Sequence, residues 1–496
     1  MANYIGIDLG TTFSAVAYID KTGRPKIVNN DRDENITPSV VARIKGKVVV
    51  GERARRQWGN DDSKGAARFK RDMGTQVTHE VDGLDLSPTE LSGAVLAELK
   101  RNTEQRVGPI SEAVVTIPAN FAHEARDATM EAAKLAGINV KFIINEPTAA
   151  ALYYAYQADG KLSGTYVVFD LGGGTFDVTV LRVAGHEIEV LASNGLHKLG
   201  GDDFDRALWR LVAQKYKGDT GKDLTTEDYS INDAEEEKIS LSGRKKATAE
   251  IGRDLVDLTR VEFEEAISSL IGQIEMMCES TLDDAGISPS DVSSVFLAGG
   301  STRIPAVVDI VEKVFKQKPI STVNVDEVVA LGAALYAAYK SDGENLSEIQ
   351  KRSVDKLTVS EKTNSCFGTI SLGYSESKGE TLVNSILIPK GQSIPCTVKE
   401  NYYTISDGQT KINCRITESK SPETNPKFVK IIHEQDLTIP EGLPAGQEIE
   451  VQYSYDENQM MHASFKHKES GMEVSISLSM GSGKKTSSEI DKFLVD

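Results

Sequence analysis

Two segments of the chain repeat one arrangement of an aspartate, a glycine turn and a threonine. They read Asp8-Leu9-Gly10-Thr11-Thr12-Phe13 and Asp170-Leu171-Gly172-Gly173-Gly174-Thr175-Phe176-Asp177. Glycine lets backbone N–H groups approach phosphate oxygens, and threonine hydroxyls add donors. An aspartate at the end of a strand can hold hydrated Mg²⁺. Two such hairpins facing each other would clasp a triphosphate. Ordinary hairpins with glycine turns are the alternative, and the matched Asp and Thr in both copies disfavour it.

A third glycine turn lies near residue 300. The stretch Phe296-Leu297-Ala298-Gly299-Gly300-Ser301-Thr302-Arg303 follows an expected strand, and a helix is expected from about Ile304. Two adjacent glycines allow a flat base and its ribose to lie against the backbone. The signal is weak alone, because such turns are common between strands and helices, and it gains weight as the third member of a set.

The elements that must position these turns indicate a mixed α/β region from residue 1 to about 340. Short β-branched runs, such as Tyr166–Phe169 and Val295–Ala298, alternate with helical patterns. Ser87-Pro88-Thr89-Glu90 predicts a capped helix start. Further helices are expected from about Ala122 to Gly137, and over Arg260 to Ala285 with Gly286 just beyond.

The remainder of the chain has a different sequence pattern. Residues 341–356 are polar and are expected to be a linker, and residues 357–480 show the alternation of an all-β sandwich, as in Ile449, Val451, Tyr453 and Tyr455. Residues 481–496 are rich in Ser, Lys and Gly and are expected to form a flexible tail. A chain of 496 residues is too long for one core, so several domains are expected.

Composition excludes several classes of function. A net charge of −18 argues against binding nucleic acid or an anionic membrane surface. None of the 4 cysteines forms a C-x-x-C pair, so a zinc or redox site is not expected. No signal segment or long apolar run is visible, and a cytoplasmic location is expected.

These segments together resemble the DnaK-type seventy-kilodalton heat-shock chaperones, members of the actin-like and sugar-kinase-like ATPase superfamily. Further matching runs are Ile143-Ile144-Asn145-Glu146-Pro147-Thr148-Ala149-Ala150 and Leu199-Gly200-Gly201-Asp202-Asp203-Phe204. The resemblance covers nearly the whole chain. It implies an α/β actin-like ATPase domain of two similar lobes, followed by an all-β sandwich that binds peptides.

The resemblance also implies roles for individual residues. Catalysis would involve Lys70, Glu146, Asp170, Thr175 and Asp177, and Asp8 and Asp170 would hold Mg²⁺ largely through water. ATP or ADP would be bound by Gly10, Thr11, Thr12, Phe13, Gly172, Gly173, Gly174, Gly200, Gly201, Glu235, Lys238, Ser242, Gly299, Gly300, Ser301, Arg303 and Asp326. K⁺ is a further candidate ion. Without the family, Lys70 would be read as a surface lysine, and Glu235, Lys238 and Ser242 as a solvated helix face.

The implied mechanism is slow ATP hydrolysis by positioning and electrostatics. Hydrolysis would change the affinity of the sandwich for extended apolar segments of unfolded proteins. Leu372, Ile405 and Ile412 are candidate peptide contacts, and a place in the plain sandwich core is an equal alternative for them. A J-domain co-chaperone and a nucleotide-exchange factor are the implied partners in protein folding and the stress response.

The chain departs from the family pattern in several places. Phe13 stands where a small polar residue or tyrosine is usual, and Phe142 stands where an arginine that helps to dock the J-domain is usual. The leucine-rich linker is reduced to Leu357-Thr358-Val359-Ser360-Glu361, so weaker docking of the linker is expected. The segment around Met73–Leu84 is short, as in smaller bacterial relatives, and no helical lid is expected before the chain ends at Asp496.

Three alternatives to a cycling chaperone remain. The linker, Phe142 and the expected lack of a lid favour a nucleotide-bound, weakly cycling co-chaperone or scaffold. Lys70, Glu146, Asp170 and Thr175 favour a working ATPase, because a scaffold does not need them. A sugar kinase and an actin-like filament protein are disfavoured, because the β-sandwich has no role in either.

Overall fold

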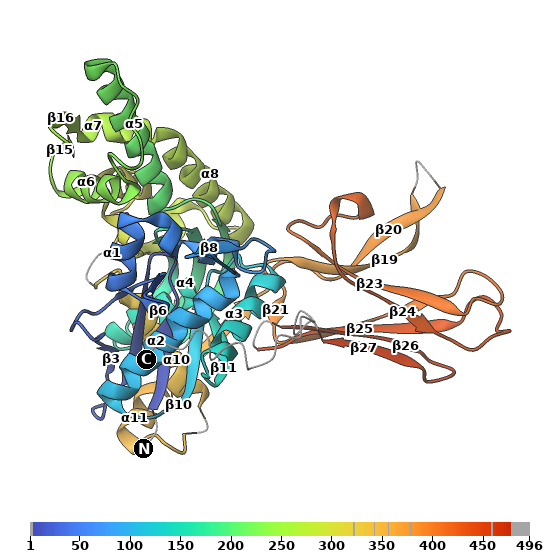
Figure 1. Ribbon diagram of the computed structural model, residues 1–496. Helices are drawn as coiled ribbons and strands as arrows, with labels where there is room; N and C mark the ends of the chain where they lie inside the picture. Colours follow the sequence, from blue (N-terminus) through green and yellow to red (C-terminus); the bar gives the residue numbers. More distant parts are fainter. Residues whose placement is uncertain are drawn as a thin grey trace. The chain divides into compact units, whose positions relative to one another are not determined.

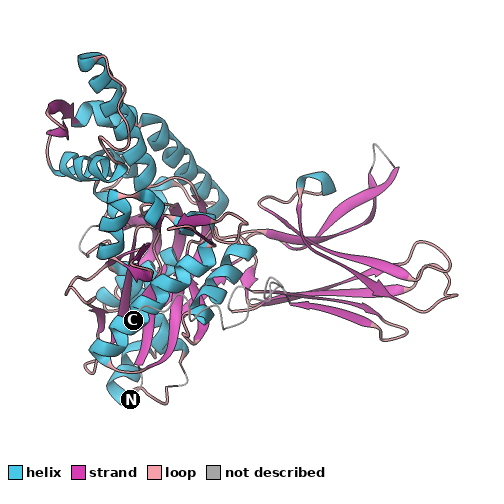
Figure 2. Ribbon diagram, in the orientation of Figure 1, coloured by secondary structure: helices cyan, strands magenta, loops and turns pink. Residues whose placement is uncertain are grey.

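A computed structural model describes residues 3–320, 323–341, 343–355, 357–375, 379–457 and 460–477 of the chain. The described residues divide into two compact units, with the boundary between Val359 and Ser360. The first unit mixes helices and strands, whereas the second is built of strands (Figures 1 and 2). The sequence placed the start of the β region at residue 357; in the structure Leu357 and Val359 pack with the first unit.

One sheet of the first unit carries the first aspartate–glycine turn. Its strand order is β11 (Val140–Asn145), β10 (Ile110–Ile117), β1 (Asn3–Asp8), β2 (Phe13–Ile19) and β3 (Pro25–Val28). Strand β1 runs antiparallel to β2 and parallel to β10. Asp8 is therefore the last residue of a central strand, where its carboxylate faces the edge at which the loops gather.

A second sheet repeats this arrangement around the second turn. Its order begins β17 (Val292–Ala298), β12 (Ser163–Leu171), β13 (Phe176–Ala184) and β14 (Glu187–Leu196). Strand β12 is antiparallel to β13 and parallel to β17. Asp170 lies one residue before the end of β12, in the position that Asp8 holds in β1. The repetition is the expected pair of similar lobes.

Helices α4 (Glu146–Gln157) and α10 (Val328–Lys340) pack into one apolar core with residues of both sheets. Their close approach requires glycine at two positions. A Cβ at Gly332 would overlap the carbonyl of Ala149, and a Cβ at Gly6 would overlap the backbone of α10 at Ala333 and Ala334. Because the helices rest directly on backbone, the two strands that end in aspartate are held at a fixed separation.

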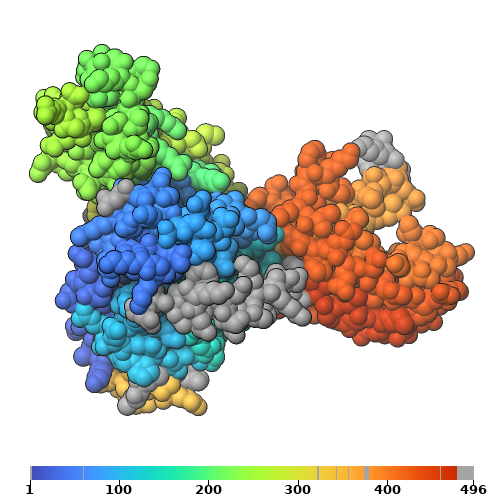
Figure 3. All heavy atoms as spheres, viewed as in Figure 1, coloured from blue at the N-terminus to red at the C-terminus, as the bar shows by residue number. Residues whose placement is uncertain are grey.

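Two smaller groups of elements stand beside the sheets. One holds β5 (Val40–Ile44), β6 (Lys47–Val50), α1 (Glu52–Asn60), η1 (Asp62–Lys64), β7 (Gly65–Ala67), η2 (Phe69–Asp72), β8 (His79–Val81), β9 (Leu84–Leu86), α2 (Pro88–Val107) and α3 (His123–Leu135). Just before it in the chain, β4 (Thr37–Pro38) pairs with β2 as the sixth strand of the first sheet. The other holds α5 (Gly201–Thr220), α6 (Ile231–Gly243), β15 (Lys246–Ile251), β16 (Asp254–Thr259), α7 (Arg260–Ala266), α8 (Ser268–Ala285), η3 (Pro289–Asp291), η4 (Gly300–Arg303) and α9 (Pro305–Phe315). The green segment of α5 to α7 lies next to the blue segment around α1 in the space-filling view (Figure 3).

The helix boundaries agree with the sequence at α2, where Ser87 and Glu90 form the expected reciprocal capping box. The prediction of one helix over Arg260 to Ala285 is wrong in one respect, because this segment forms two helices, α7 and α8. Ile267 leaves helical geometry (φ −97°, ψ 2°) between α7 and α8, and its side chain is buried. Gly286 ends α8 in the left-handed region, as expected.

The expected linker over residues 341–356 also needs correction, because it contains helix α11 (Glu348–Val354). Ser347 and Gln350 form a capping box at its start. Val354 is buried in the core that contains α10. The helix is too short to show apolar periodicity, so only its cap was a local signal.

The second unit is a sandwich of two four-stranded sheets around one apolar core. One sheet has the order β20 (Gly379–Ile388), β19 (Cys366–Ser375), β23 (Lys411–Ser419) and β24 (Lys430–Thr438), and the other has β22 (Cys396–Tyr403), β25 (Glu448–Tyr455), β26 (Met461–His467) and β27 (Glu473–Ser477). Strand β18 (Thr358–Lys362) pairs with β21 (Ser393–Ile394), and η5 spans Pro426–Phe428. Ile449, Val451, Tyr453 and Tyr455 all point into the core, as their alternation predicted. The expected tail, residues 481–496, lies outside the described residues.

Candidate functional site

A cavity of about 560 Å³ opens in the first unit where β1, β12 and β17 end. The three glycine turns predicted from the sequence all line it, although they lie far apart along the chain. Residues of η2, α4, α5, α6 and η4 complete its wall. A cavity of this volume is large enough for a nucleotide.

The two aspartate–glycine turns meet at the cavity floor. A Cβ at Gly173 would overlap the hydroxyl of Thr12, and a Cβ at Gly174 would overlap the side chain of Thr11. The turns therefore interlock only with glycine at these positions. The Thr12 hydroxyl is buried and has no hydrogen-bond partner among the described residues. A buried hydroxyl without a partner in a cradle of backbone N–H groups fits a phosphate oxygen.

The second turn is tied to the start of helix α5. The backbone N–H of Gly201 donates to Gly172 O at 3.0 Å, and that of Asp202 donates to Gly173 O at 2.8 Å. Ser301 Oγ, from the third turn, donates to Gly172 O at 2.9 Å. Gly200 does not line the cavity but lies against Gly173, where a Cβ would stand 2.6 Å from the carbonyl oxygen. The second turn, Gly172–Thr175, which we call the phosphate turn, is thus supported both by the start of α5 and by Ser301.

Lys70 lies in the wall of the cavity, buried and paired. Its ammonium group donates to Glu146 Oε1 at 2.6 Å, and both side chains are at least nine-tenths buried. Glu146 is the first residue of α4, and Lys70 belongs to the short turn η2. The reading of Lys70 as a surface lysine is excluded, since such a buried cation must interact with an anion.

Four carboxylates gather around Lys70. Burial, with the charge of Glu146 adding to it, raises the pKa of Asp8 to about 7. The same causes raise the pKa of Asp177 to about 7 and that of Asp170 well above its usual range. Asp177 does not line the cavity; its carboxylate lies behind and accepts a hydrogen bond from Asn120 Nδ2 at 3.0 Å. So much buried negative charge calls for a bound cation.

The far side of the cavity holds the residues expected to grip adenosine. Lys238 Nζ pairs with Asp205 Oδ1 at 2.7 Å, and Glu235 accepts a hydrogen bond from Arg55 at 2.9 Å. Arg303 and Asp326, both predicted for this site, pair with each other at 2.8 Å. The hydroxyl of Ser242 donates to its own helix, at Lys238 O.

Sequence reasoning missed several residues of this wall. Asp202 and Asp205 line the cavity, and so do apolar residues that offer a surface for a base. The apolar set is Ile36, Ile239, Ile304, Val325 and Val329. Asp202 lies in the Leu199–Phe204 run whose glycines were predicted to bind nucleotide, and Asp205 follows it directly, so a local signal was present. The apolar residues carry no local signal.

A fit to Mg²⁺ can be judged from the donor set. Within the described ranges, no group of three His, Cys, Asp or Glu side chains lies close enough to hold a metal alone. Mg²⁺ prefers one or two carboxylates completed by phosphate oxygens and water. Asp8 at the end of β1 and Asp170 near the end of β12 both line the cavity beside the glycine turns. These two carboxylates fit the ligand set that Mg²⁺ prefers.

The three candidate peptide residues lie in the second unit. Leu372 on β19 and Ile405 after β22 are exposed, whereas Ile412 on β23 packs against the sandwich core. Leu372 lies opposite Leu382 in the register of β19 and β20, and Leu382 is also exposed. Two neighbouring exposed leucines on one sheet form an apolar surface that the core does not use.

Comparison with known proteins places this site in a family. A protein-family model described as Hsp70 protein matches residues 4–83 and 75–496. The chain is 36% identical to the chaperone protein DnaK of Mycoplasmopsis agalactiae, over 99% of the chain and 81% of that protein. It is 35% identical to the chaperone protein DnaK of Thermus thermophilus, over 96% of the chain and 80% of that protein. The chain belongs to the Hsp70 family.

As an Hsp70 protein, the chain is an ATP-dependent chaperone and an ATPase, and both predictions are confirmed. The family binds ATP and ADP with Mg²⁺, in agreement with the phosphate turns and the carboxylates described above. The family also accounts for the architecture of an actin-like ATPase domain followed by a β-sandwich. The sugar-kinase and actin-filament alternatives are thereby excluded.

The two aromatic departures of this Hsp70 protein have visible environments. Phe13 lines the cavity, and the guanidinium of Arg55 lies 5.6 Å from the centre of its ring. Phe142, on β11, lies under the ammonium of Lys340 at 5.5 Å. Each ring thus faces a cation, which stabilises both groups modestly. Within the part of the chain that the structure describes, no helix is both long and apolar enough to cross a membrane.

Proposed function

We propose that this Hsp70 protein binds ATP·Mg²⁺ in the 560 Å³ cavity and hydrolyses it slowly, and that the bound nucleotide controls how the β-sandwich holds extended apolar peptides. The observation that carries the proposal is the convergence of three glycine turns on a buried lysine and four carboxylates. A buried ammonium, four carboxylates and backbone turns with an unpartnered Thr12 hydroxyl match a ligand that carries phosphates and a metal cation.

The chain's own residues can be given roles in hydrolysis. The backbone N–H groups of Thr11, Thr12 and Gly173–Thr175 would bind phosphate oxygens. Those of Gly10 and Gly172 close the turns themselves, because they donate to Ser14 Oγ and Thr175 O. Lys70 stabilises negative charge on the terminal phosphate, and Glu146 holds the ammonium in place. Asp8 and Asp170 would hold Mg²⁺, which neutralises phosphate charge when it is bound. Thr175, which lines the cavity, would orient the attacking water, and Asp177, behind the cavity wall, would add negative charge near the reacting phosphate.

The adenosine would lie between the third turn and helix α6. Arg303, which is half exposed, can lie against one side of the base, and Ile239 on α6 can cover the other. Glu235, Lys238 and Ser242 would bind the ribose. Gly300 leaves room for the base because it lacks a Cβ, whereas the missing Cβ of Gly299 makes room for the carbonyl of Leu171.

The sandwich offers an apolar surface for a peptide. Leu372 and Leu382 form an exposed cross-strand pair, and Ile405 is 68% exposed. An extended peptide contacts such a surface with alternate side chains. Ile412 supports this surface from the core side. The proposed partners further include a J-domain co-chaperone and a nucleotide-exchange factor in the cytoplasm, and K⁺ would be a second ion at the phosphates.

A weakly cycling scaffold remains the second candidate, because Phe142 replaces the arginine expected for J-domain docking. One observation opposes it. Leu357 is 3% exposed and Val359 packs against the same core, so both remaining apolar linker residues contact the first unit. A linker that packs on the nucleotide-binding unit can transmit its state.

The test is single-turnover ATP hydrolysis on the whole chain, with and without an extended apolar peptide. Hydrolysis that the peptide accelerates supports the proposed function. Hydrolysis without a response to peptide would favour an uncoupled ATPase. Binding of ATP without hydrolysis would contradict the catalytic assignment and favour the scaffold.

A further inference from the structure

The turn that carries Lys70 has an unusual backbone. Arg68, the residue before helix η2, adopts φ 62° and ψ 9°, the left-handed conformation. Non-glycine residues enter this region at a cost of roughly 1 kcal/mol and rarely do so without a local reason. Just beyond this left-handed residue, Lys70 lines the cavity, whereas Arg68 and Arg71 contact the start of helix α5.

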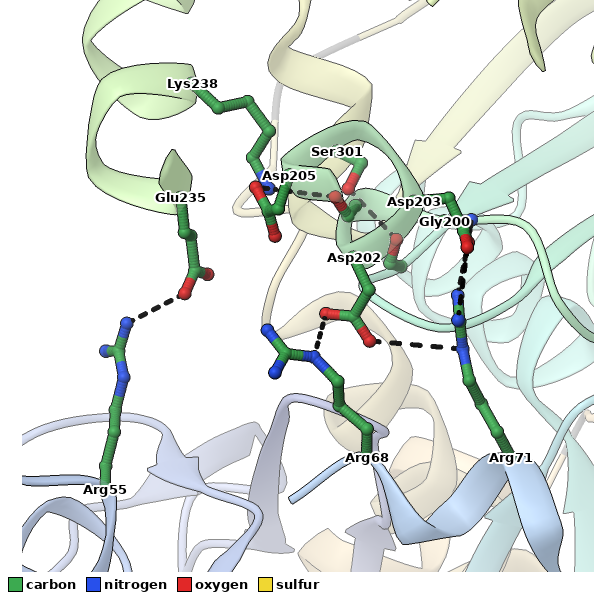
Figure 4. Close-up of polar contacts among 12 residues, drawn as sticks. Arg55, Arg68, Arg71, Gly200, Asp202, Asp203, Asp205, Glu235, Lys238 and Ser301 are labelled. Atoms are coloured by element: carbon green, nitrogen blue, oxygen red, sulfur yellow. Dashed lines mark hydrogen bonds and ion pairs between the residues drawn. The ribbon is translucent and has the colours of Figure 1, made fainter. Parts of the chain in front are cut away.

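Arg68 and Arg71 bind the start of helix α5, as Figure 4 shows. Arg68 Nε lies 2.7 Å from Asp202 Oδ1. Arg71 donates two hydrogen bonds to Asp203, at 2.5 and 3.4 Å. The two arginines thus reach across from the group of elements around α1 to the group around α5.

The Arg68–Asp202 pair is shielded from water. The side chain of Arg68 is 15% exposed and that of Asp202 is 3% exposed. The guanidinium of Arg68 also lies over the ring of Trp58, 5.1 Å from its centre. Burial disfavours the charge on Arg68, but the contact with Asp202 and the charges of Asp205 and Glu235 together outweigh it, so that the pKa of Arg68 lies above its ordinary value.

Asp202 connects this pair to the phosphate turn. Its own backbone N–H donates to Gly173 O, and that of its neighbour Gly201 donates to Gly172 O. A continuous path therefore runs from the turn bearing Lys70, through Arg68 and Asp202, to Gly172 and Gly173. Each step is a direct polar contact of at most 3.0 Å or a covalent link of adjacent residues.

We propose that Arg68 is a positioning residue, which holds the Lys70 turn in register with the phosphate turn Gly172–Thr175 through its ion pair with Asp202. The inference rests on the proposed function of that site, in which Lys70 stabilises the terminal phosphate. A displacement of about 1 Å in such a group can slow a reaction by roughly 100-fold. Without the pair, Lys70 would keep its contact with Glu146, but only Arg71 would still join its turn to helix α5, so its alignment with the phosphate turn would be less exact.

The experiment compares variants by single-turnover hydrolysis at saturating ATP and by the Kd of ATP. Arg68→Ala is expected to slow hydrolysis roughly 10- to 100-fold, with a smaller change in Kd. Arg68→Lys keeps the charge and should recover part of the rate. Arg56→Ala is the matched control, because Arg56 is 67% exposed and pairs within its own helix with Glu52; it should hydrolyse ATP like the parent.

A double-mutant cycle separates positioning from general stability. If Arg68 acts through Lys70, Arg68→Ala should slow hydrolysis by less than about twofold when Lys70 is already alanine. Equal slowing in both backgrounds, or no slowing in either, would overturn the inference. Asp202→Asn, which keeps the shape of the side chain, serves as the second variant if Arg68→Ala does not fold, and must reproduce the same loss.

The same series distinguishes the inference from the function on which it rests. Should Lys70→Ala hydrolyse ATP at the parent rate, the proposed role of Lys70 fails, whatever Arg68 does. Should Lys70→Ala be slow and Arg68→Ala normal, the proposed function stands and the positioning role is rejected.

Discussion

At the scale of single residues, the main feature of this site is that it buries several charged side chains. Lys70, Glu146 and three aspartates lie in one water-poor pocket, where an unpaired charge is costly. The pairing of Lys70 with Glu146 offsets part of that cost, and burial together with the charge of Glu146 raises the pKa values of Asp8 and Asp177 to about 7. A buried ammonium and carboxylates beside glycine turns suit a ligand that brings a metal cation and phosphates together.

Removal of the Lys70 ammonium should affect the chemical step more than binding. Lys70→Ala is expected to slow single-turnover hydrolysis roughly 100- to 1,000-fold, as for loss of one preorganised donor to a developing charge. ATP should still bind through the glycine turns, which can be measured by isothermal titration calorimetry. Lys64→Ala, at an exposed lysine of the nearby η1, is the control and should leave the rate unchanged.

The pH dependence of stability can be predicted at Asp205. Burial raises its pKa from 3.8 to about 7, opposed by Lys238 and supported by the charges of Glu235 and Asp202. Arg68 also faces this group. Between these two pH values the folded chain keeps a proton that the unfolded chain has released, so Asp205 lowers the free energy of unfolding as pH rises through that window.

An Asp205→Asn variant removes this dependence. Its free energy of unfolding, relative to the parent, should rise with pH from about 4 and level off above about 7. Urea unfolding without nucleotide at several pH values provides the measurement. Asp219→Asn, at an exposed aspartate of the same helix, is the control. A relative stability of Asp205→Asn that falls with pH would contradict the assignment.

At the scale of elements, close backbone contacts determine how the turns meet. Gly299 has φ 80°, and a Cβ there would collide with the carbonyl of Leu171 and lie 2.8 Å from Asp170 Oδ1. The end of β17 is therefore seated directly on the end of β12. The same applies where α10 rests on β1 and α4 through Gly6 and Gly332.

A matched pair of glycine substitutions separates backbone strain from collision. Gly299 and Gly286 both have positive φ, but nothing lies within 4 Å of a Cβ at Gly286. Gly286→Ala should cost about 1 kcal/mol of stability and leave ATP binding intact. Gly299→Ala should cost more and weaken ATP binding at least tenfold, because the carboxylate of Asp170 must move. Equal ATP affinity in the two variants would argue against this account.

At the scale of the whole molecule, the segment between the two units is held by the first. Leu357 is buried in the core that contains α10, and Thr358 N donates to His186 O at 3.1 Å. The two apolar residues of the reduced linker, Leu357 and Val359, thus both pack against the first unit. Through these contacts, a change of conformation in the nucleotide-binding unit can alter the position of the segment that leads into the sandwich.

Loss of that contact should uncouple the units without affecting basal hydrolysis. Leu357→Ala deletes a buried side chain, at a cost of roughly 2–5 kcal/mol to the docking of the segment. Acceleration of hydrolysis by an apolar peptide should then be lost, while the rate without peptide stays that of the parent. Thr358→Ala, which keeps the backbone hydrogen bond and alters an exposed side chain, should retain the response.

The sequence by itself determined the features that depend on neighbouring residues. The glycine turns after Asp8 and Asp170, the capping box of Ser87 and the alternation of the sandwich strands are all local patterns, so they could be recognised without a fold. The family resemblance supplied Lys70 and Glu146 as candidates. It did not show that Lys70 and Glu146 form an ion pair, because these residues lie 76 positions apart in the chain.

The tertiary structure decided the contacts between distant segments. Arg71 and Asp203 are 132 residues apart, and neither they nor the Arg68–Asp202 pair has a local signal. The break at Ile267 and the short helix α11 were also decided by burial against other elements and not by periodicity. The physical reason is common to all of them: propensity and turn chemistry act over a few residues, whereas ion pairs, burial and the shape of the cavity exist only once the chain has packed.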